Sequence, residues 1–189
     1  MFYIGHSFGS SLGNVIATQY PQSCDAFVLT GYSAGLADNP LFTKPANKLY
    51  PRFAALSLGY QVSYNATNRQ DVLYGPVGTF DPTMFSIDVA TQDTITFGQY
   101  ATIDIGFGTA SNYTGPVRII SGGKDDVFCN NADCGFGTDS QLGPATKFFP
   151  AATNFLYYAV PDTGHDSNLQ YTAREVFEDV HGWLGEHGF

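Results

Sequence analysis

Residues 2–9 leave this chain few local structures to choose from. The run Phe-Tyr-Ile at residues 2–4 is apolar, aromatic and β-branched, and such a run is typical of a buried strand. Gly5 and Gly9 lie on either side of Ser7, and glycines permit the sharp turn that would lift this serine hydroxyl out of the backbone. We therefore predict a strand, a tight turn and a helix in immediate succession.

Apolar periodicity predicts two long helices. The first covers residues 8–19 and ends before Pro21, with a stripe at i, i+3, i+4 and i+7 formed by Leu12, Val15, Ile16 and Gln19. The second ends at Gly185, and its stripe consists of Leu169, Ala173, Val176, Phe177, Val180, Trp183 and Leu184. The first pattern predicts a helix that the chain enters directly from the turn, and the second predicts an amphipathic helix that packs on the sheet.

Short apolar runs predict the rest of that sheet. Residues 26–30, 117–121 and 155–160 are bounded by Gly or Pro and have the composition of interior strands of a parallel sheet. Strands that alternate with helices indicate an α/β fold with right-handed crossovers. In such folds the ligands bind beyond the carboxyl ends of the strands.

Residues 35–115 are too long for a simple connection between two strands. Aromatic residues are frequent within them, so we predict an aromatic-rich cap or lid inserted into a single domain that spans residues 1–189. No repeat and no linker divides the chain into separate bodies.

The composition excludes several functions. Apolar residues make up 43% and charged residues 13% of the 189 residues, a profile of a packed globular chain rather than a disordered one. With a formal net charge of −9 and only 8 Lys and Arg, nucleic acid is not an expected partner. No apolar run is long enough to span a membrane, so we expect a soluble protein.

The cysteines and two sequons favour an oxidising compartment. Cys129 and Cys134 close a short loop, and a disulfide there would stabilise the fold by roughly 2 kcal/mol; the alternative is two free thiols. Asn65 and Asn112 begin N-x-T patterns for glycosylation, which also favours secretion. Cys24 is either a buried free thiol, which we prefer, or half of another disulfide. No CxxC spacing exists, and we expect neither a metal nor a cofactor.

Serine is a nucleophile only when a base removes its proton and an acid orients that base. His165 follows the run that ends at Val160, at the carboxyl edge where Ser7 is also expected. Two aspartates follow the run that ends at Ser121. Asp125 is the preferred acid and Asp126 the reserve, because a shift of one residue along the chain reverses which of the two side chains faces inward.

The remaining candidates have simpler interpretations. His6 alternates away from Ser7 and is expected to pack beside the turn, while His181 and His187 lie off the apolar stripe of the last helix. Asp162 and Asp166 flank the predicted base and are expected to shape its loop.

The order Ser7, Asp125, His165, with a Gly-x-Ser-x-Gly turn between strand and helix, resembles the α/β-hydrolase superfamily. Within it the chain is similar to secreted serine esterases and lipases, including fungal ones. The resemblance implies that Ser7 is the nucleophile, His165 the general base and acid, Asp125 the orienting carboxylate, and the Phe8 amide one oxyanion donor.

The chain departs from that family at its beginning. A complete member has about four strands before this turn and a loop with the second oxyanion donor, so the resemblance implies the carboxyl-terminal half of an α/β-hydrolase fold, with about four parallel strands. The first strand would then have an apolar unpaired edge that favours self-association. Losing one donor typically costs ~100- to 1000-fold in turnover, so we expect weak activity.

Two functions from different classes fit these residues. The first is a serine hydrolase that cleaves a carboxylic ester of an apolar substrate; amides share this chemistry, whereas epoxide and haloalkane enzymes carry aspartate where Ser7 stands. The second is a non-catalytic, hydrolase-like binding protein or an inactive fragment whose aromatic cap holds a ligand.

Overall fold

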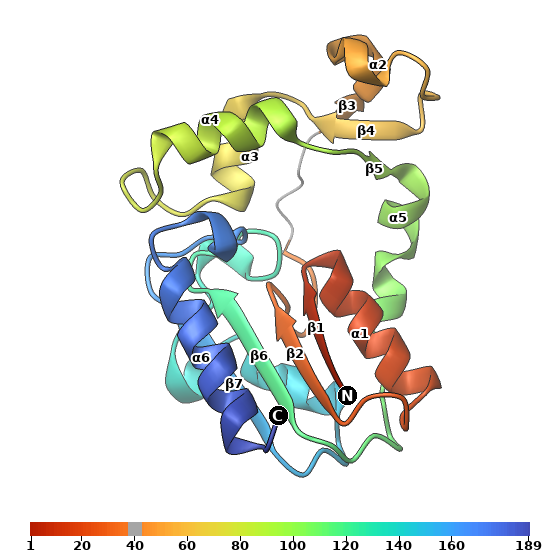
Figure 1. Cartoon of the computed structure of the whole chain (residues 1–189), viewed down its shortest axis with the longest axis vertical. Coiled ribbons are helices and arrows are strands. Elements are labelled where there is room, and N and C mark those ends of the chain that lie inside the picture. Colours follow the sequence, from red (N-terminus) through yellow and green to blue (C-terminus); the bar gives the residue numbers. More distant parts are fainter. Residues whose placement is uncertain (38–42) are drawn as a thin grey trace.

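The computed structural model describes residues 1–37 and 43–189 of the chain. A parallel sheet of four strands in the order β1-β2-β6-β7 forms its lower body (Figure 1). The strands are β1 Phe2–His6, β2 Ala26–Thr30, β6 Val117–Gly122 and β7 Phe155–Val160. The predicted α/β class and the four predicted strands are confirmed, although β1 extends past its apolar run to His6 and β6 is one residue longer than its run.

Alternating side chains of the sheet build two cores. Phe27 and Leu29 point to the face covered by α1, Phe8–Gln19, whereas Val28 between them points to the face covered by α6, Ala173–Glu186. On β6 the same alternation places Ile119 in the first core and Ile120 in the second. The two long helices therefore lie on opposite faces, and both buried faces of β2 are apolar, as in other parallel sheets.

The buried face of α1 differs from its apolar stripe, of which Ile16 packs against the first core. Leu12 is 42% exposed, and the helix instead buries small or polar residues that include Gly13 and Asn14. A Cβ on Gly13 would lie 2.7 Å from side-chain atoms of Leu29 and Tyr3, so α1 approaches β1 and β2 too closely for a large side chain. Close backbone approach, which apolar periodicity does not reveal, decides which face is buried.

The carboxyl-terminal elements also differ in part from the prediction. β7 is an edge strand among the described residues rather than an interior one, and its Leu156 is 43% exposed. Leu169 belongs to a separate 3₁₀ turn, Ser167–Leu169, because α6 begins only at Ala173. Phe177 on α6 is 49% exposed, so the packed stripe is narrower than the apolar one.

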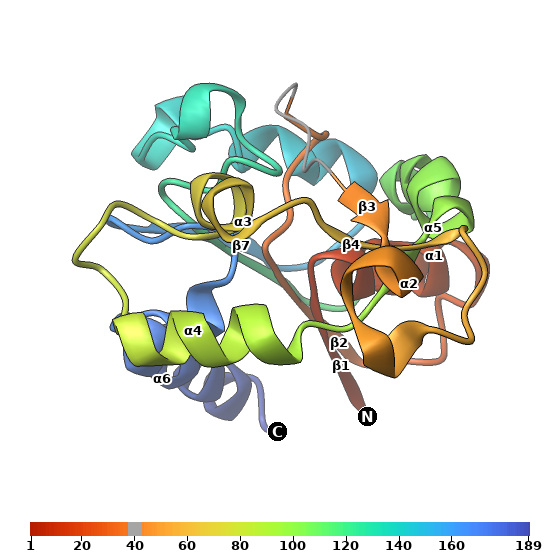
Figure 2. The same ribbon diagram turned by 90° about the horizontal axis from the view of Figure 1, so that it is seen from above.

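The chain between β2 and β6, called here the β2–β6 segment, contains a second sheet with strand order β3-β4-β5. Its strands are β3 Thr43–Pro45, β4 Tyr60–Ser63 and β5 Ile95–Thr96. Its helices are α2 Ala46–Leu49, α3 Ala66–Leu73, α4 Pro82–Thr91 and α5 Phe97–Thr102, followed by the 3₁₀ helix Ile103–Phe107. The second sheet and helices α2, α3 and α4 lie beyond the carboxyl ends of the parallel strands, whereas α5 leads back to the 3₁₀ helix beside α1; Figure 2 shows this arrangement from above. Residues 38–42 of the predicted cap lie outside the described residues.

Local capping explains where the helices of this segment begin. Asn65 accepts a hydrogen bond from the amide of Asn68 at the start of α3, and Asp81 accepts one from the amide of Thr83 at the start of α4. Thr96 forms a capping box at the start of α5. Each of these polar residues satisfies helix amides that have no acceptor within the helix.

Part of the aromatic content of the β2–β6 segment forms a core of its own. Tyr74 and Phe80 are buried, and Phe85 packs against both of their rings. Other aromatic side chains remain at the surface, among them Phe97, which is 59% exposed. Among the helices in the described part of the chain, none combines the length and apolar character needed to cross a membrane.

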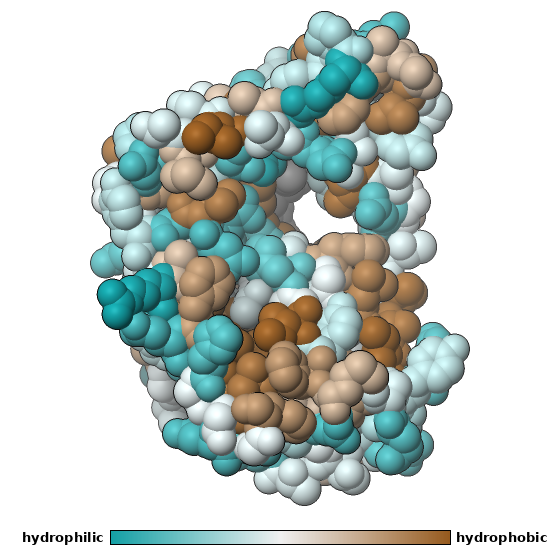
Figure 3. All heavy atoms as spheres, viewed as in Figure 1, coloured by the Kyte–Doolittle hydropathy of each residue, from teal (hydrophilic) through white to brown (hydrophobic). Residues whose placement is uncertain are grey.

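β1 lies at the other edge of the parallel sheet, as predicted, and pairs with β2. Its Phe2 and Ile4 are 42% and 50% exposed, and Phe2 contacts the ring of Phe189. Brown side chains gather on this face of the lower body in Figure 3. Such an edge can pair with another chain, and self-association remains a prediction.

We expect Ile120→Ala to lower the free energy of unfolding by about 2 to 5 kcal/mol, because it leaves a cavity in a fully buried position between the sheet and α6. Ile4→Ala, the matched change at a half-exposed position of β1, should cost no more than about 0.5 kcal/mol. Urea unfolding followed by circular dichroism measures both, and equal losses would contradict this assignment of the core.

Candidate functional site

Ser7 occupies a strained turn between β1 and α1. Its φ of 54° and ψ of −120° lie outside the regions that serine ordinarily adopts. A Cβ on Gly5 would lie 2.6 Å from the carbonyl carbon and oxygen of Gly9, so only glycine fits there. The predicted strand, turn and helix are therefore present, with the serine at the apex of the turn.

Thr30, at the carboxyl end of β2, holds this turn in place. Its carbonyl oxygen accepts hydrogen bonds from the Ser7 amide at 2.9 Å and from the Ser10 hydroxyl at 2.7 Å. Its own hydroxyl donates to the carbonyl oxygen of Gly5 at 3.0 Å. Because a hydroxyl has one proton, the 3.0 Å contact between His6 Nδ1 and this hydroxyl must be donated by the histidine.

The structure brings Ser7, His165 and Asp125 together in one chain of contacts. His165 Nδ1 lies 2.9 Å from Asp125 Oδ2, and His165 Nε2 lies 2.7 Å from the Ser7 hydroxyl oxygen. The carboxylate accepts the proton on Nδ1, which leaves Nε2 of the neutral ring free to accept the proton of Ser7. This is the tautomer that a general base next to a serine requires.

Asp125 is fully buried just beyond β6 and is fixed by the backbone. Its Oδ1 accepts the amides of Val127 and Phe128 at 2.9 and 3.0 Å, while Oδ2 meets His165. Asp125, the first choice of the two candidate acids, therefore occupies the position expected of the orienting carboxylate.

Two rings contact the imidazole of His165. Phe128 stacks on it with a centroid distance of 5.6 Å and an interplanar angle of 22°, and the centroid of the His6 ring lies 5.0 Å away. Gly31 has a φ of +55°, and a Cβ there would come within 2.9 Å of both histidine rings. His6 packs beside the turn as predicted, whereas no sequence pattern singled out Phe128 or Gly31.

Opposing effects set the protonation of His165. Burial of the ring by itself lowers its pKa, but the charge and hydrogen bond of Asp125 and the charge of Asp166 outweigh this and raise the pKa above its usual value. A base with a raised pKa binds the proton of Ser7 more readily, although it loses that function earlier as the pH falls.

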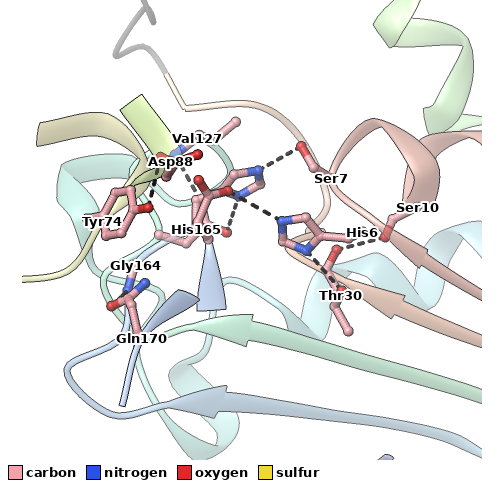
Figure 4. A network of polar contacts seen from close by, with 12 residues as sticks. His6, Ser7, Ser10, Thr30, Tyr74, Asp88, Val127, Gly164, His165 and Gln170 are labelled. Atoms are coloured by element: carbon pink, nitrogen blue, oxygen red, sulfur yellow. Dashed lines mark hydrogen bonds and ion pairs between the residues drawn. The ribbon is translucent and has the colours of Figure 1, made fainter. Parts of the chain in front are cut away.

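Further polar residues surround this centre, as Figure 4 shows. His6, His165 and Asp166 could each offer one metal ligand, and their ligand atoms lie within 4.8 Å of one another. Both nitrogens of His165 are already engaged, and Arg69 places a guanidinium nitrogen 3.9 Å from Asp166. The cluster therefore suits an ion-paired network better than a cation.

A cavity of about 490 Å³ lies in front of Ser7 and His165. Its other lining residues are the aromatic or aliphatic side chains of Phe8, Leu36, Ala37, Val72, Leu73, Ile95, Phe97, Tyr100, Ile103 and Val127, together with Thr43. No lysine, arginine or carboxylate lines it within residues 1–37 and 43–189. Phe8 begins α1, so its amide has no acceptor within the helix and is available to an oxyanion.

The cysteines and sequons lie away from this cavity lining. Cys129 and Cys134 form a disulfide. The amide of Cys129 donates to the carbonyl oxygen of Asp125, so the disulfide adjoins the loop that carries Asp125. Cys24 is free and half-buried rather than buried. Asn65 and Asn112 are both exposed. Asn65 caps α3 through its side-chain oxygen, which leaves free the side-chain nitrogen to which a glycan would be attached.

No protein-family model and no curated protein matches the sequence. Among solved structures, a monoacylglycerol lipase from Paleococcus ferrophilus matches with a TM-score of 0.64 and 13% identity over 99% of this chain and 68% of its own. A thermophilic esterase from Thermogutta terrifontis matches with a TM-score of 0.58 and 15% identity over 98% of this chain and 65% of its own. An alpha/beta hydrolase fold protein from Chitinophaga pinensis matches with a TM-score of 0.54 and 13% identity over 93% of this chain and 62% of its own. The chain thus spans about two thirds of the length of these structures.

We expect Gly31→Ala to reduce the free energy of unfolding by about 2 to 5 kcal/mol, from left-handed strain and from displacement of His6 and His165. Gly78→Ala is the control, since Gly78 has a φ of +98° with no atom within 4 Å of its added Cβ, and it should cost only about 1 to 2 kcal/mol. Urea titration compares them; a Gly31 variant no less stable than the Gly78 variant would contradict the contact with the two rings.

Proposed function

Because the chain has the α/β-hydrolase fold, we propose that it is a serine hydrolase that cleaves carboxylic esters of apolar substrates through an acyl-Ser7 intermediate. The observation that carries the proposal is the continuous array from Asp125 through His165 to Ser7, with contacts of 2.9 and 2.7 Å, at an apolar cavity. Fold alone would not suffice, since one fold hosts many reactions.

In the first half of the reaction the Ser7 oxygen attacks the ester carbonyl carbon while His165 Nε2 takes its proton. Asp125 stabilises the resulting imidazolium and keeps its own charge. The carbonyl oxygen becomes an oxyanion that the Phe8 amide can stabilise by donation. His165 then returns the proton to the departing alcohol oxygen, which breaks the ester bond and leaves the acyl group on Ser7.

The second half repeats these roles with water. His165 removes a proton from a water molecule that attacks the acyl carbon, and the same proton returns to Ser7 when the carboxylic acid departs. The raised pKa of His165 suits both transfers, since the residue must accept a proton and then donate it. The mechanism uses residues of this chain alone at each step.

The cavity lining supports an apolar and uncharged substrate. Burying a carboxylate or ammonium group among these side chains, without a charged partner, would be costly. Tyr100 and Ile103 of the β2–β6 segment contribute to the wall, so we propose that this segment serves as the lid over the acyl or alcohol portion. An amide would fit the same chemistry; ester hydrolysis is proposed because its leaving group needs less assistance.

The alternative of a non-catalytic binding protein is less well supported. A binding site gains nothing from a buried carboxylate that fixes the tautomer of a histidine, nor from strain at Ser7. Those features have a cost in stability, and catalysis is the role that accounts for them.

We propose further that the protein is secreted and glycosylated. The Cys129–Cys134 disulfide and the exposed sequons at Asn65 and Asn112 support this compartment. When the protein is expressed through a eukaryotic secretory pathway, glycosidase treatment should lower its mass, and Asn65→Gln with Asn112→Gln should abolish that shift. A secreted product with no glycan on either asparagine would contradict the glycosylation proposal.

Ser7→Ala should abolish both labelling by a fluorophosphonate probe and turnover of p-nitrophenyl butyrate, because loss of the nucleophile in such triads costs of the order of 10⁶-fold in turnover. Ser23→Ala, at an exposed serine outside the cavity lining, should leave both unchanged. Gel fluorescence and absorbance measure these outcomes. Labelling that persists in the Ser7 variant would show that another residue is the nucleophile.

A further inference from the structure

Asp166 follows the proposed base His165 in sequence and connects three parts of the molecule. Its Oδ1 lies 3.6 Å from His6 Nε2, beside Ser7, and its Oδ2 lies 3.9 Å from Arg69 of α3. The mechanism proposed above gives Asp166 no part. The side chain is nevertheless only 18% exposed, and an acid is seldom placed so without partners.

Arg69 links this carboxylate to the β2–β6 segment. Its guanidinium binds both oxygens of Asp88 on α4 at 2.6 Å, in the two-pronged geometry that arginine favours with carboxylates. The hydroxyl of Tyr74 donates to Asp88 at 2.8 Å. The network therefore extends without a break from the turn that carries Ser7 to the helices α3 and α4.

Hydrogen bonds hold the loop of His165 to the carboxyl end of α3 and to the residues that follow it. The amide of Asp166 donates to the carbonyl oxygen of Leu73, the last residue of α3, at 2.7 Å. The side-chain oxygen of Gln170 accepts the amide of Gly164 at 3.0 Å and that of Gly75 at 3.2 Å. Movement of α3 would therefore shift the loop on which the base stands.

His6 needs a partner for its second nitrogen. Nδ1 donates to the Thr30 hydroxyl, so Nε2 forms an ion pair with Asp166 only when the ring carries both protons. The same ring is one of the two walls beside His165. When the His6 ring is protonated, Asp166 therefore fixes the rotation of a ring that contacts the proposed base.

We propose that Asp166 is a positioning residue of this site, which holds the His6 ring beside His165 and fastens the β2–β6 segment to the base loop. This role rests on the proposed function and adds to it a fourth residue, which acts through others and does not touch the reacting atoms.

The charge of Asp166 also affects a measurable quantity, the pKa of His165, which a purely structural role of Asp166 would leave unchanged. The groups that face His165 are Asp125, Ser7, His6 and Asp166, and behind Asp166 lies Arg69. Asp166 is one of the contributors that raise the pKa of His165. Removing its charge should lower that pKa, so that the active neutral ring persists to a lower pH.

The test compares Asp166→Asn, which keeps shape and removes charge, with Asp166→Ala, which removes both. Asp162→Asn is the matched control, because it makes the same charge change on an exposed residue of the same loop. In ¹⁵N-histidine NMR, Asp166→Asn should lower the His165 midpoint by about one pH unit, and the acid limb of kcat/KM should shift equally. Asp166→Ala should have a kcat several-fold lower than that of Asp166→Asn. Asp162→Asn should change neither the His165 midpoint nor the acid limb of kcat/KM.

The outcomes are distinguishable from those of the proposed function. If the wild-type protein hydrolyses no ester and takes no probe, the proposed function is wrong, and the NMR titration still decides the placement of Asp166. If the His165 midpoint is the same in the wild type and in Asp166→Asn, the proposed role is overturned, even where thermal stability falls. If Asp162→Asn lowers the midpoint as much as Asp166→Asn does, the effect is general loop charge, and the role is likewise overturned.

Discussion

The imidazole of His165 is the group on which the other features of the site depend. It joins Asp125 beyond β6 to Ser7 at the end of β1, residues that are far apart in sequence and are brought together by the parallel sheet. A ring that must hold two hydrogen bonds at once tolerates little rotation. Its contacts with the rings of Phe128 and His6, and the absence of a side chain at Gly31, serve that one requirement.

The features that were predictable from sequence are those with local causes. The strand, glycine turn and helix around Ser7 are encoded within residues 2–19, and the loops of Asp125 and His165 follow apolar runs whose ends can be recognised. The apolar stripe of α1 does not indicate which face the helix buries, because contact of Gly13 with Leu29 depends on the packing distance between helix and strand. Periodicity records hydrophobicity along one element and contains no information on how closely its neighbour approaches.

The site residues that the sequence did not reveal belong to long-range partnerships. Arg69 and Asp166 are distant in the chain, and a lone arginine on a predicted lid resembles any solvated cation until α3 is placed over the base loop. The interpretation of Asp166 as a residue that shapes its loop was correct in part, since its amide binds Leu73. Its approach to His6 required the fold, because the two residues meet only when β1 and β7 end at the same edge of the sheet.

Thr30 has a wider consequence for how this site can vary. Its carbonyl group binds Ser7 and Ser10, and its hydroxyl group bridges Gly5 and His6, so one buried threonine positions both Ser7 and the ring beside His165. A substitution at Thr30 would displace Ser7 and His6 together, whereas a substitution in the cavity wall would change only its own part of the lining. The arrangement of Ser7, His6 and His165 is therefore expected to tolerate fewer substitutions on β2 than the cavity wall does, so the wall can vary while this arrangement is kept.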